Sequence, residues 1–286
     1  KISSIVFKFF QNETELAKAY GDKSIESTSG LNPTSLKKVN PNKDNINEVT
    51  LPRVFGVFLN QNTDAVFLNK EIRQALEISA PKKKIVDEVL FGFGKILSGP
   101  TPADIEEDPQ KSEGNIEAAK TLLLNSGWKA NSDGILEKKT KKDTVSFNFS
   151  ISTSDAPELK ATAEILATTW RQLGASVAVK VFEAGDLSQN VIKPRKYDAL
   201  LFGEVVGAES DLYPFWHSSE RNDPGLNISL YTNITVDKAL EDMRKETDIQ
   251  KQLASKKIIV SEFLKLVHIV THIVPRINFT SHSQIS

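Results

Sequence analysis

Residues 53–60 read RVFGVFLN, and this nearly unbroken apolar run predicts a β-strand. Strands that are apolar on both faces lie in the middle of a sheet whose two sides are covered by helices. The next regular stretch, residues 70–76, carries Ile72, Ala75 and Leu76 at helical spacing. The chain therefore begins its main fold with a buried strand followed by a helix.

The same alternation continues along the chain. Further strands are predicted at residues 2–10, 144–152, 176–182, 197–202 and 266–274. Helices are predicted at residues 13–20, 84–90, 115–126, 157–173, 236–244 and 249–264, and a loop at residues 27–47. Strand, helix and strand in succession favour an α/β fold with a mixed sheet flanked by helices.

Composition narrows the class of protein. A chain of 286 residues is long enough for about two lobes. A net charge of -1 lacks the basic excess expected of a nucleic-acid binder. The absence of cysteine removes disulfides and thiolate sites, and no apolar run reaches the ~20 residues that a membrane helix needs. Because the chain starts at Lys1, we expect a processed or excised piece, and an upstream signal or lipid anchor stays open.

Few residues of this sequence are candidates for catalysis or metal binding. His268 and His272 share a strand face but lack a third metal ligand, so no metal site is expected. His217 is followed by two serines, yet no strained turn presents either as a nucleophile, and we interpret the motif as a polar edge beside Trp216. The carboxylates after the strand at 197–202 suit either acid–base chemistry or an amine-binding pocket. They are Glu204, Glu209 and Asp211.

Eight stretches, taken in order, resemble the family 5 extracellular solute-binding proteins, the receptors of peptide and nickel ABC importers. The first four are RVFGVFLNQ at 53–61, the helical segment 71–90, SGPTP at 98–102 and AAKTLLLNSGWKANSDGI at 118–135. The others are LGASVAVK at 173–180, RKYDALLFG at 195–203, DLYPFWHSS at 211–219 and GLNISLYTNITVD at 225–237. The resemblance covers most of the chain.

The resemblance implies a periplasmic-binding-protein-like (type II) fold of two lobes that close on a ligand by hinge motion. It implies the extracytoplasmic solute-binding component of an ABC importer, which captures peptides or peptide-like solutes and makes or breaks no bond. It further implies permease subunits as partners, no cofactor, no insertion of this chain into the membrane, and a place on the periplasmic or extracellular face of the cytoplasmic membrane.

The resemblance also suggests how the chain is divided. Residues 53–265 are expected to form the main α/β ligand-binding lobe. Residues 1–52, with a strand, a helix and a linker, and residues 266–286, a C-terminal return segment, are expected to belong to the other lobe.

The expected ligand site follows the strand at 197–202. Peptide receptors of the family carry an aspartate there for the ligand's amino terminus, and Val206 or Gly207 stands at the matching place. Glu204 is our candidate for the missing negative charge. The full set of expected ligand-binding residues is Arg195, Gly203, Glu204, Val206, Glu209, Asp211, Tyr213 and Trp216.

Two other functions stay open at this point. A binding, sensor or scaffold module that keeps the fold without transport is the alternative, because the amine site departs from the family pattern. A hydrolase built on Glu204, Glu209 and Asp211 is a third, less favoured hypothesis.

Overall fold

The structure is a computed structural model, and it describes residues 3–29, 31, 35, 44–50, 53–63, 65–99, 108–141, 143–205, 211–266 and 269–282. Its strands are β1 (Ser27–Ser29), β2 (Asp44–Thr50), β3 (Arg53–Leu59), β4 (Gly94–Leu97), β5 (Lys129–Ala130), β6 (Leu136–Lys139), β7 (Thr144–Ser146), β8 (Asn148–Ser154), β9 (Ser176–Phe182), β10 (Ala199–Val205) and β11 (Ile269–His282). Its α-helices are α1 (Glu13–Gly21), α3 (Lys70–Ser79), α4 (Lys82–Lys84), α5 (Pro109–Glu113), α6 (Ile116–Asn125), α7 (Pro157–Gln172), α8 (Ala184–Asp186), α9 (Tyr213–Trp216), α10 (Ile234–Lys245) and α11 (Ile249–Leu266). Short 3-10 or π turns are η1 (Ala65–Leu68), η2 (Ile85–Val89), η3 (Leu187–Ile192) and η4 (Ser218–Arg221).

The main sheet is mixed, as the sequence predicts. Its strands follow the order β11, β3, β10, β8, β9. β10 runs parallel to β8 and antiparallel to β3, and β8 runs parallel to β9. The long helix α7 connects β8 to β9, which is the crossover that parallel neighbours require.

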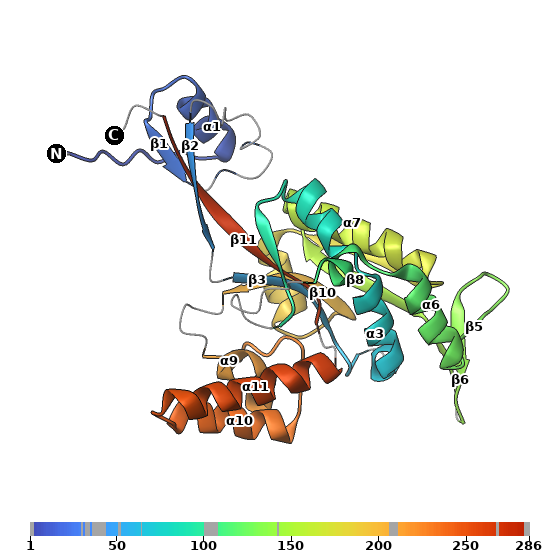
Figure 1. The fold of residues 1–286 in the computed structure, drawn as a ribbon. Coiled ribbons are helices and arrows are strands. Elements are labelled where there is room, and N and C mark those ends of the chain that lie inside the picture. Colours follow the sequence, from blue (N-terminus) through green and yellow to red (C-terminus); the bar gives the residue numbers. More distant parts are fainter. Residues whose placement is uncertain are drawn as a thin grey trace.

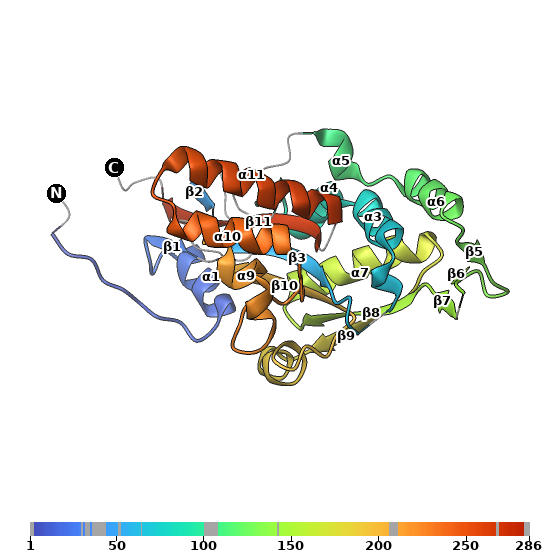
Figure 2. The same cartoon turned by 90° about the horizontal axis from the view of Figure 1, so that it is seen from below.

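Helices cover both faces of this sheet and form two hydrophobic cores. Alternate residues of β3 point to opposite faces, so that Val57 and Leu59 enter a core beneath α3, α6 and α7. Val54 and Phe58 enter a second core beneath α9, α10 and α11. α10 and α11 lie side by side against that second face (Figure 2). The central position predicted for residues 53–60 is therefore confirmed.

A small unit lies at one end of the molecule and consists of α1, β1, β2 and the last part of β11 (Figure 1). β11 pairs with β3 and β4 up to Pro275, and from Arg276 onward it pairs with β2. The predicted return segment therefore begins before the point at which β11 changes sheets. The division at residues 52 and 266 stays a prediction.

Three expectations about strands differ from the structure. Residues 3–10 form no strand, because no described segment pairs with them, and the side chains of Ile5, Val6, Phe7 and Phe9 are exposed. The expected loop at 27–47 contains β1 and the start of β2, which pair with β11 far along the chain. The expected strand at 144–152 is interrupted at Phe147, and β7 and β8 join different sheets.

No helix in the described part of the chain has the length and apolarity needed to cross a membrane.

The exposure of residues 3–10 can be tested against a buried phenylalanine. Phe9 is 94% exposed and Phe58 is 1% exposed. We expect Phe9→Ala to change the free energy of unfolding by less than about 0.5 kcal/mol, whereas Phe58→Ala should lower it by about 3–5 kcal/mol. Urea unfolding followed by tryptophan fluorescence measures both. A comparable loss in the two variants would show that residues 3–10 are packed.

Candidate functional site

One edge of the main sheet brings together strand ends and both connections to the small unit. Val205 at the end of β10 pairs with Arg53 at the start of β3, so the β2–β3 connection lies at that edge. β11 pairs Ile269 with Phe58 and Ile273 with Phe55, so it leaves the sheet at the same edge. β8 and β9 also end there, because both run parallel to β10. In open α/β sheets, ligands bind beyond the carboxyl ends of the strands, and this edge is therefore the candidate site.

Glu204 is a buried carboxyl group near the end of β10. Its side chain is on the same face of the strand as Leu200 and Phe202, both of the second core, and its cross-strand neighbour is Val54. The residue is 8% exposed. Burial raises the pKa of this carboxyl well above its ordinary value, and the nearby positive charge of Arg195 lowers it only in part. Burial of Glu204 therefore favours the protonated, neutral form of its carboxyl group.

The side chain of Arg195 stabilises the loops around the site by hydrogen bonds to their backbone. Its Nε donates to the carbonyl of Arg221 at 3.0 Å, its Nη1 to that of Ile192 at 2.8 Å and its Nη2 to that of Gly225 at 2.6 Å. The backbone of Arg195 has a positive φ of 57°. Three carbonyl oxygens thus hold the guanidinium beside Glu204, without an ion pair between the two side chains among the described contacts.

Gly203 allows a close approach between two strands. A β-carbon at this position would lie 2.6–2.9 Å from ring carbons of Phe55, which is the cross-strand neighbour on β3. The aromatic ring therefore occupies the space above the glycine. Gly203 shapes the edge through this contact and offers no side chain to a ligand.

Asp211 and Tyr213 are held by Arg244 of α10. The Nε of Arg244 donates to both carboxylate oxygens of Asp211, at 3.1 and 3.0 Å, and the guanidinium lies 3.9 Å from the centre of the Tyr213 ring. Partial burial alone would raise the pKa of Asp211, but the hydrogen bonds from Arg244 and the Tyr213 backbone lower it below its ordinary value. Asp211 is ionised and fixes the start of α9 to α10.

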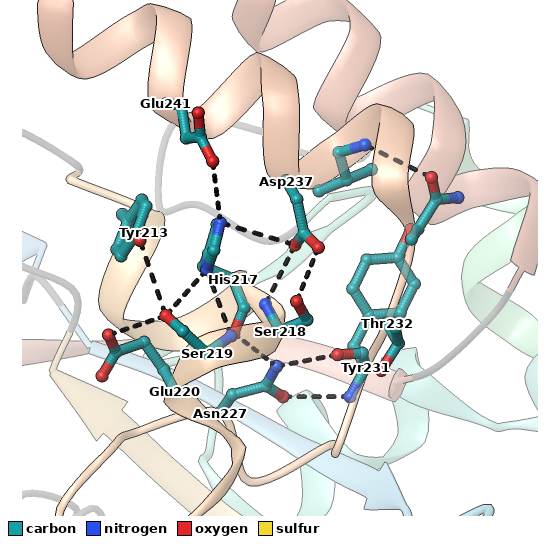
Figure 3. Close-up of polar contacts among 12 residues, drawn as sticks. Tyr213, His217, Ser218, Ser219, Glu220, Asn227, Tyr231, Thr232, Asp237 and Glu241 are labelled. Atoms are coloured by element: carbon teal, nitrogen blue, oxygen red, sulfur yellow. Dashed lines mark hydrogen bonds and ion pairs between the residues drawn. The ribbon is translucent and has the colours of Figure 1, made fainter.

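His217 stands at the centre of a polar cluster (Figure 3). Its ring stacks on that of Tyr213, with centroids 4.1 Å apart, and its Nδ1 lies 2.8 Å from Ser219 Oγ. Its Nε2 lies 3.5 Å from Glu241 and 4.0 Å from Asp237. The serine, imidazole and carboxylate thus lie in a row, which the sequence did not predict.

The hydrogen bonds show that the side chain of His217 caps the N-terminus of η4. The backbone N–H of Ser219 donates to Nδ1 of His217 at 3.1 Å, and the Ser219 hydroxyl donates to Glu220 at 3.1 Å. Ser218 instead turns to Asp237, whose carboxylate accepts its N–H and hydroxyl at 2.9 and 2.6 Å. Because Nδ1 already accepts a backbone proton, His217 serves here as the cap of η4 and not as the base for a nucleophile.

The remaining predicted residues divide into two groups. Trp216 is buried in the second core, where its ring stacks on Phe58 at 6.4 Å between centroids. Val206 and Glu209 lie outside the described residues, as does His268. Within the described residues, no three histidines or carboxylates are grouped to hold a metal ion.

The fold is that of the type II periplasmic binding proteins. The oligopeptide-binding protein AppA of Bacillus subtilis, solved with a nonapeptide, matches 95% of this chain and 54% of its own chain with a TM-score of 0.79 at 23% identity. NikA of Brucella suis, solved with Fe(III)-EDTA, matches 97% of this chain and 57% of its own with a TM-score of 0.79 at 17% identity. The mixed sheet and its flanking helices are therefore shared with both solved proteins.

Sequence comparison places the chain in a family. The family described as bacterial extracellular solute-binding proteins, family 5 (middle), matches residues 1–223, so the chain belongs to the family 5 solute-binding proteins. AppA of Bacillus subtilis is 31% identical over 216 residues, which are 72% of this chain and 38% of that protein. Protein XP55 of Streptomyces lividans is 31% identical over 199 residues, covering 67% of this chain and 35% of that protein. The chain thus spans less than two fifths of the length of these relatives.

Sequence reasoning missed two residues that shape the site. Arg244 lies on a helix that was predicted, but its bond to Asp211 joins residues 33 positions apart. Tyr197 donates from its hydroxyl to the carbonyl of Ile228, and burial raises its pKa. Neither contact can be predicted from neighbouring residues in the sequence. The only sign of either was Tyr197 itself, the aromatic residue at the start of the strand predicted at 197–202.

The raised pKa of Glu204 predicts how stability depends on pH. The folded state holds the proton of Glu204 more tightly than the unfolded state, so its contribution to stability is complete below the ordinary glutamate pKa and is lost as pH rises through the raised pKa. Glu204→Gln carries no such proton. We therefore expect the unfolding free energy of the parent chain, relative to this variant, to fall by up to about 1.4 kcal/mol per pH unit in that window. Urea unfolding across pH measures it, and a constant difference would contradict it.

Proposed function

We propose that this chain is the ligand-binding part of the solute-binding component of an ABC importer, and that it captures peptides or peptide-like solutes. Family membership and the printed functions of its relatives support this: AppA is an oligopeptide-binding protein, and one solved form holds a nonapeptide. These relatives are substrate-binding proteins and not enzymes. The whole receptor would act outside the cytoplasmic membrane with permease subunits as partners.

The observation that carries this proposal is the shared edge of the main sheet. The carboxyl ends of β8, β9 and β10 lie where β2 and β11 lead to the small unit. A ligand at this edge would contact strand ends on one side and the small unit on the other. Rotation of the small unit about the two connections would close the site, as in hinge closure of two lobes.

The proposed ligand-binding residues take two kinds of role. Glu204 is the last residue but one of β10, and the segment that contains Val206, Glu209 and Asp211 follows the strand. Both would face the ligand for this reason. The other members would support that surface by packing and hydrogen bonding. They are Arg195, Gly203, Tyr213 and Trp216.

Peptide binding tests the proposal directly. We expect the 286-residue chain to form one-to-one complexes with synthetic peptides, from tripeptides to nonapeptides, in native mass spectrometry and calorimetry. Free amino acids are the control ligands. An affinity in the micromolar to millimolar range, roughly -8 to -4 kcal/mol, is expected for a partial cleft. If no peptide binds at millimolar concentration, peptide capture by this chain is excluded.

A pair of matched variants locates the binding surface. Val205 at the end of β10 is 56% exposed, and Leu124 is 60% exposed on α6, which lies far from the small unit in both views (Figures 1 and 2). Val205→Arg places a large cation at the proposed edge and should weaken peptide binding at least about tenfold, a loss of 1.4 kcal/mol. Leu124→Arg should leave it unchanged. Equal effects in both variants would place the ligand elsewhere.

A further inference from the structure

One face of α10 holds the segment that follows β10. Asp237, Glu241 and Arg244 are spaced four and three residues apart along this helix, so their side chains share one side of it. Each of them contacts a different part of residues 211–219, and Figure 3 shows two of these contacts. The apolar residues of α10 pack into the second core and keep the helix in place. They are Val236, Ala239 and Leu240.

Two of the contacts attach the later part of the segment to α10. The carboxylate of Asp237 accepts the N–H and the hydroxyl of Ser218 at 2.9 and 2.6 Å. Glu241 lies 3.5 Å from Nε2 of His217, whose own side chain caps η4. The junction of α9 with η4 is therefore fixed to the helix.

Arg244 makes the third contact, at the start of the segment. Its guanidinium donates to both carboxylate oxygens of Asp211, from Nε at 3.1 and 3.0 Å and also from Nη2. It lies 3.9 Å from the centre of the Tyr213 ring, and the ring of His217 lies 4.1 Å from the same centre. Two groups at these distances cannot share one face of a ring, so both faces of Tyr213 are covered. Both oxygens of Asp211 are likewise engaged within the chain.

Asp211 lies close to the proposed ligand edge. It follows Val205, the last residue of β10, by six positions, so the two residues lie within about 20 Å of each other. It is also the first residue after β10 that the structure describes. This edge is where the proposed function places the ligand, and the inference that follows rests on that function.

We infer that Arg244 is a positioning residue of the ligand site. It holds Asp211 and Tyr213 against α10 and so fixes the place at which the chain after β10 rejoins the main fold. The groups of a binding site must be kept close to their productive geometry by supporting contacts. Arg244 therefore sets the ligand affinity without touching the ligand. Asp211 is its anchor and not a charge offered to the ligand, although it lies in the segment that faces the ligand.

An arginine suits this role. Its planar guanidinium can bind both oxygens of a carboxylate and lie flat on an aromatic ring at the same time, which an ammonium group cannot do. The side chains of Arg244 and Asp211 are 44% and 50% exposed. Solvent therefore screens this ion pair, and it contributes little to the stability of the whole fold. Its effect on ligand binding can be measured apart from folding.

Hydrogen exchange without ligand tests the hold on the segment. We expect the amides of residues 213–217 to exchange at least about fivefold faster in Arg244→Gln than in the parent chain, because the segment loses one of its supports. The amides of β3 should be unchanged, and the midpoint of thermal unfolding should shift by no more than about 3 °C. Lys238→Gln is the matched control, since it removes the same charge from an exposed position of α10 without a salt bridge among the described contacts.

Peptide affinity tests the consequence for the ligand. Each chain would be titrated by calorimetry with trialanine and with a nonapeptide of alternating serine and alanine. Arg244→Gln should bind these peptides at least about fivefold more weakly than the parent chain. Arg244→Lys should fall between the two, because it keeps the charge but loses the planar fork. Lys238→Gln should match the parent chain.

A charge exchange separates positioning from direct contact with the ligand. Asp211→Arg and Arg244→Asp each bring like charges together, and each should weaken peptide binding at least about tenfold. The double variant restores opposite charges and should return the affinity to within about threefold of the parent chain. If either residue bound the ligand directly, the exchange would present the wrong charge to it, and the affinity would not recover.

The outcomes separate this inference from peptide capture. Parent-like peptide affinity in Arg244→Gln, parent-like exchange at residues 213–217, or a double variant that stays weak overturns the positioning role and leaves peptide capture intact. If no peptide binds the parent chain at millimolar concentration, peptide capture itself fails, and the effect of Arg244 on affinity fails with it.

Discussion

The pairing of β3 with β10 is the constraint on which the rest of the structure depends. Seven residue pairs, from Ala199 opposite Leu59 to Val205 opposite Arg53, fix the register of the two central strands. This register sends alternate side chains into two separate cores. A slip of one residue would exchange the faces of all of them. The same register sets Glu204 opposite Val54 and aligns the end of β10 with the start of β3.

The pairing of β3 with β10 also determines the burial and the electrostatics of Glu204. Because Glu204 belongs to the face of Leu200 and Phe202, it is drawn into an apolar core although it lies near a strand end. The loop residue Arg195 stays beside it, held by carbonyls from Ile192, Arg221 and Gly225. A carboxyl group in such surroundings responds strongly to any charge brought near it, because the effective dielectric constant there is low. The electrostatics of the edge thus follow from packing.

The parts of the fold that could be predicted are those with local signals. The apolar run at 53–60 and the helix at 157–173 are dictated by their own residues, and the structure has both as β3 and α7. The strand expected at 2–10 has the right composition but no described partner, since pairing is decided by distant segments. For the same reason the sequence indicated acidic residues after β10 but not the burial of Glu204. The contact of Asp211 with Arg244 likewise depends on how α10 packs.

One strand ties the two parts of the molecule together mechanically. β11 has 14 residues and is therefore about 45 Å long, at roughly 3.3 Å per residue. It is hydrogen-bonded to β3 and β4 in its first part and to β1 and β2 in its second. Both ends of β11 are held by hydrogen bonds to other strands, so any movement of one part relative to the other must bend or twist the strand near Pro275. Proline has no backbone N–H, so bending there breaks no hydrogen bond donated by this residue. If the small unit rotates as proposed, this strand restricts the directions in which it can approach the main sheet.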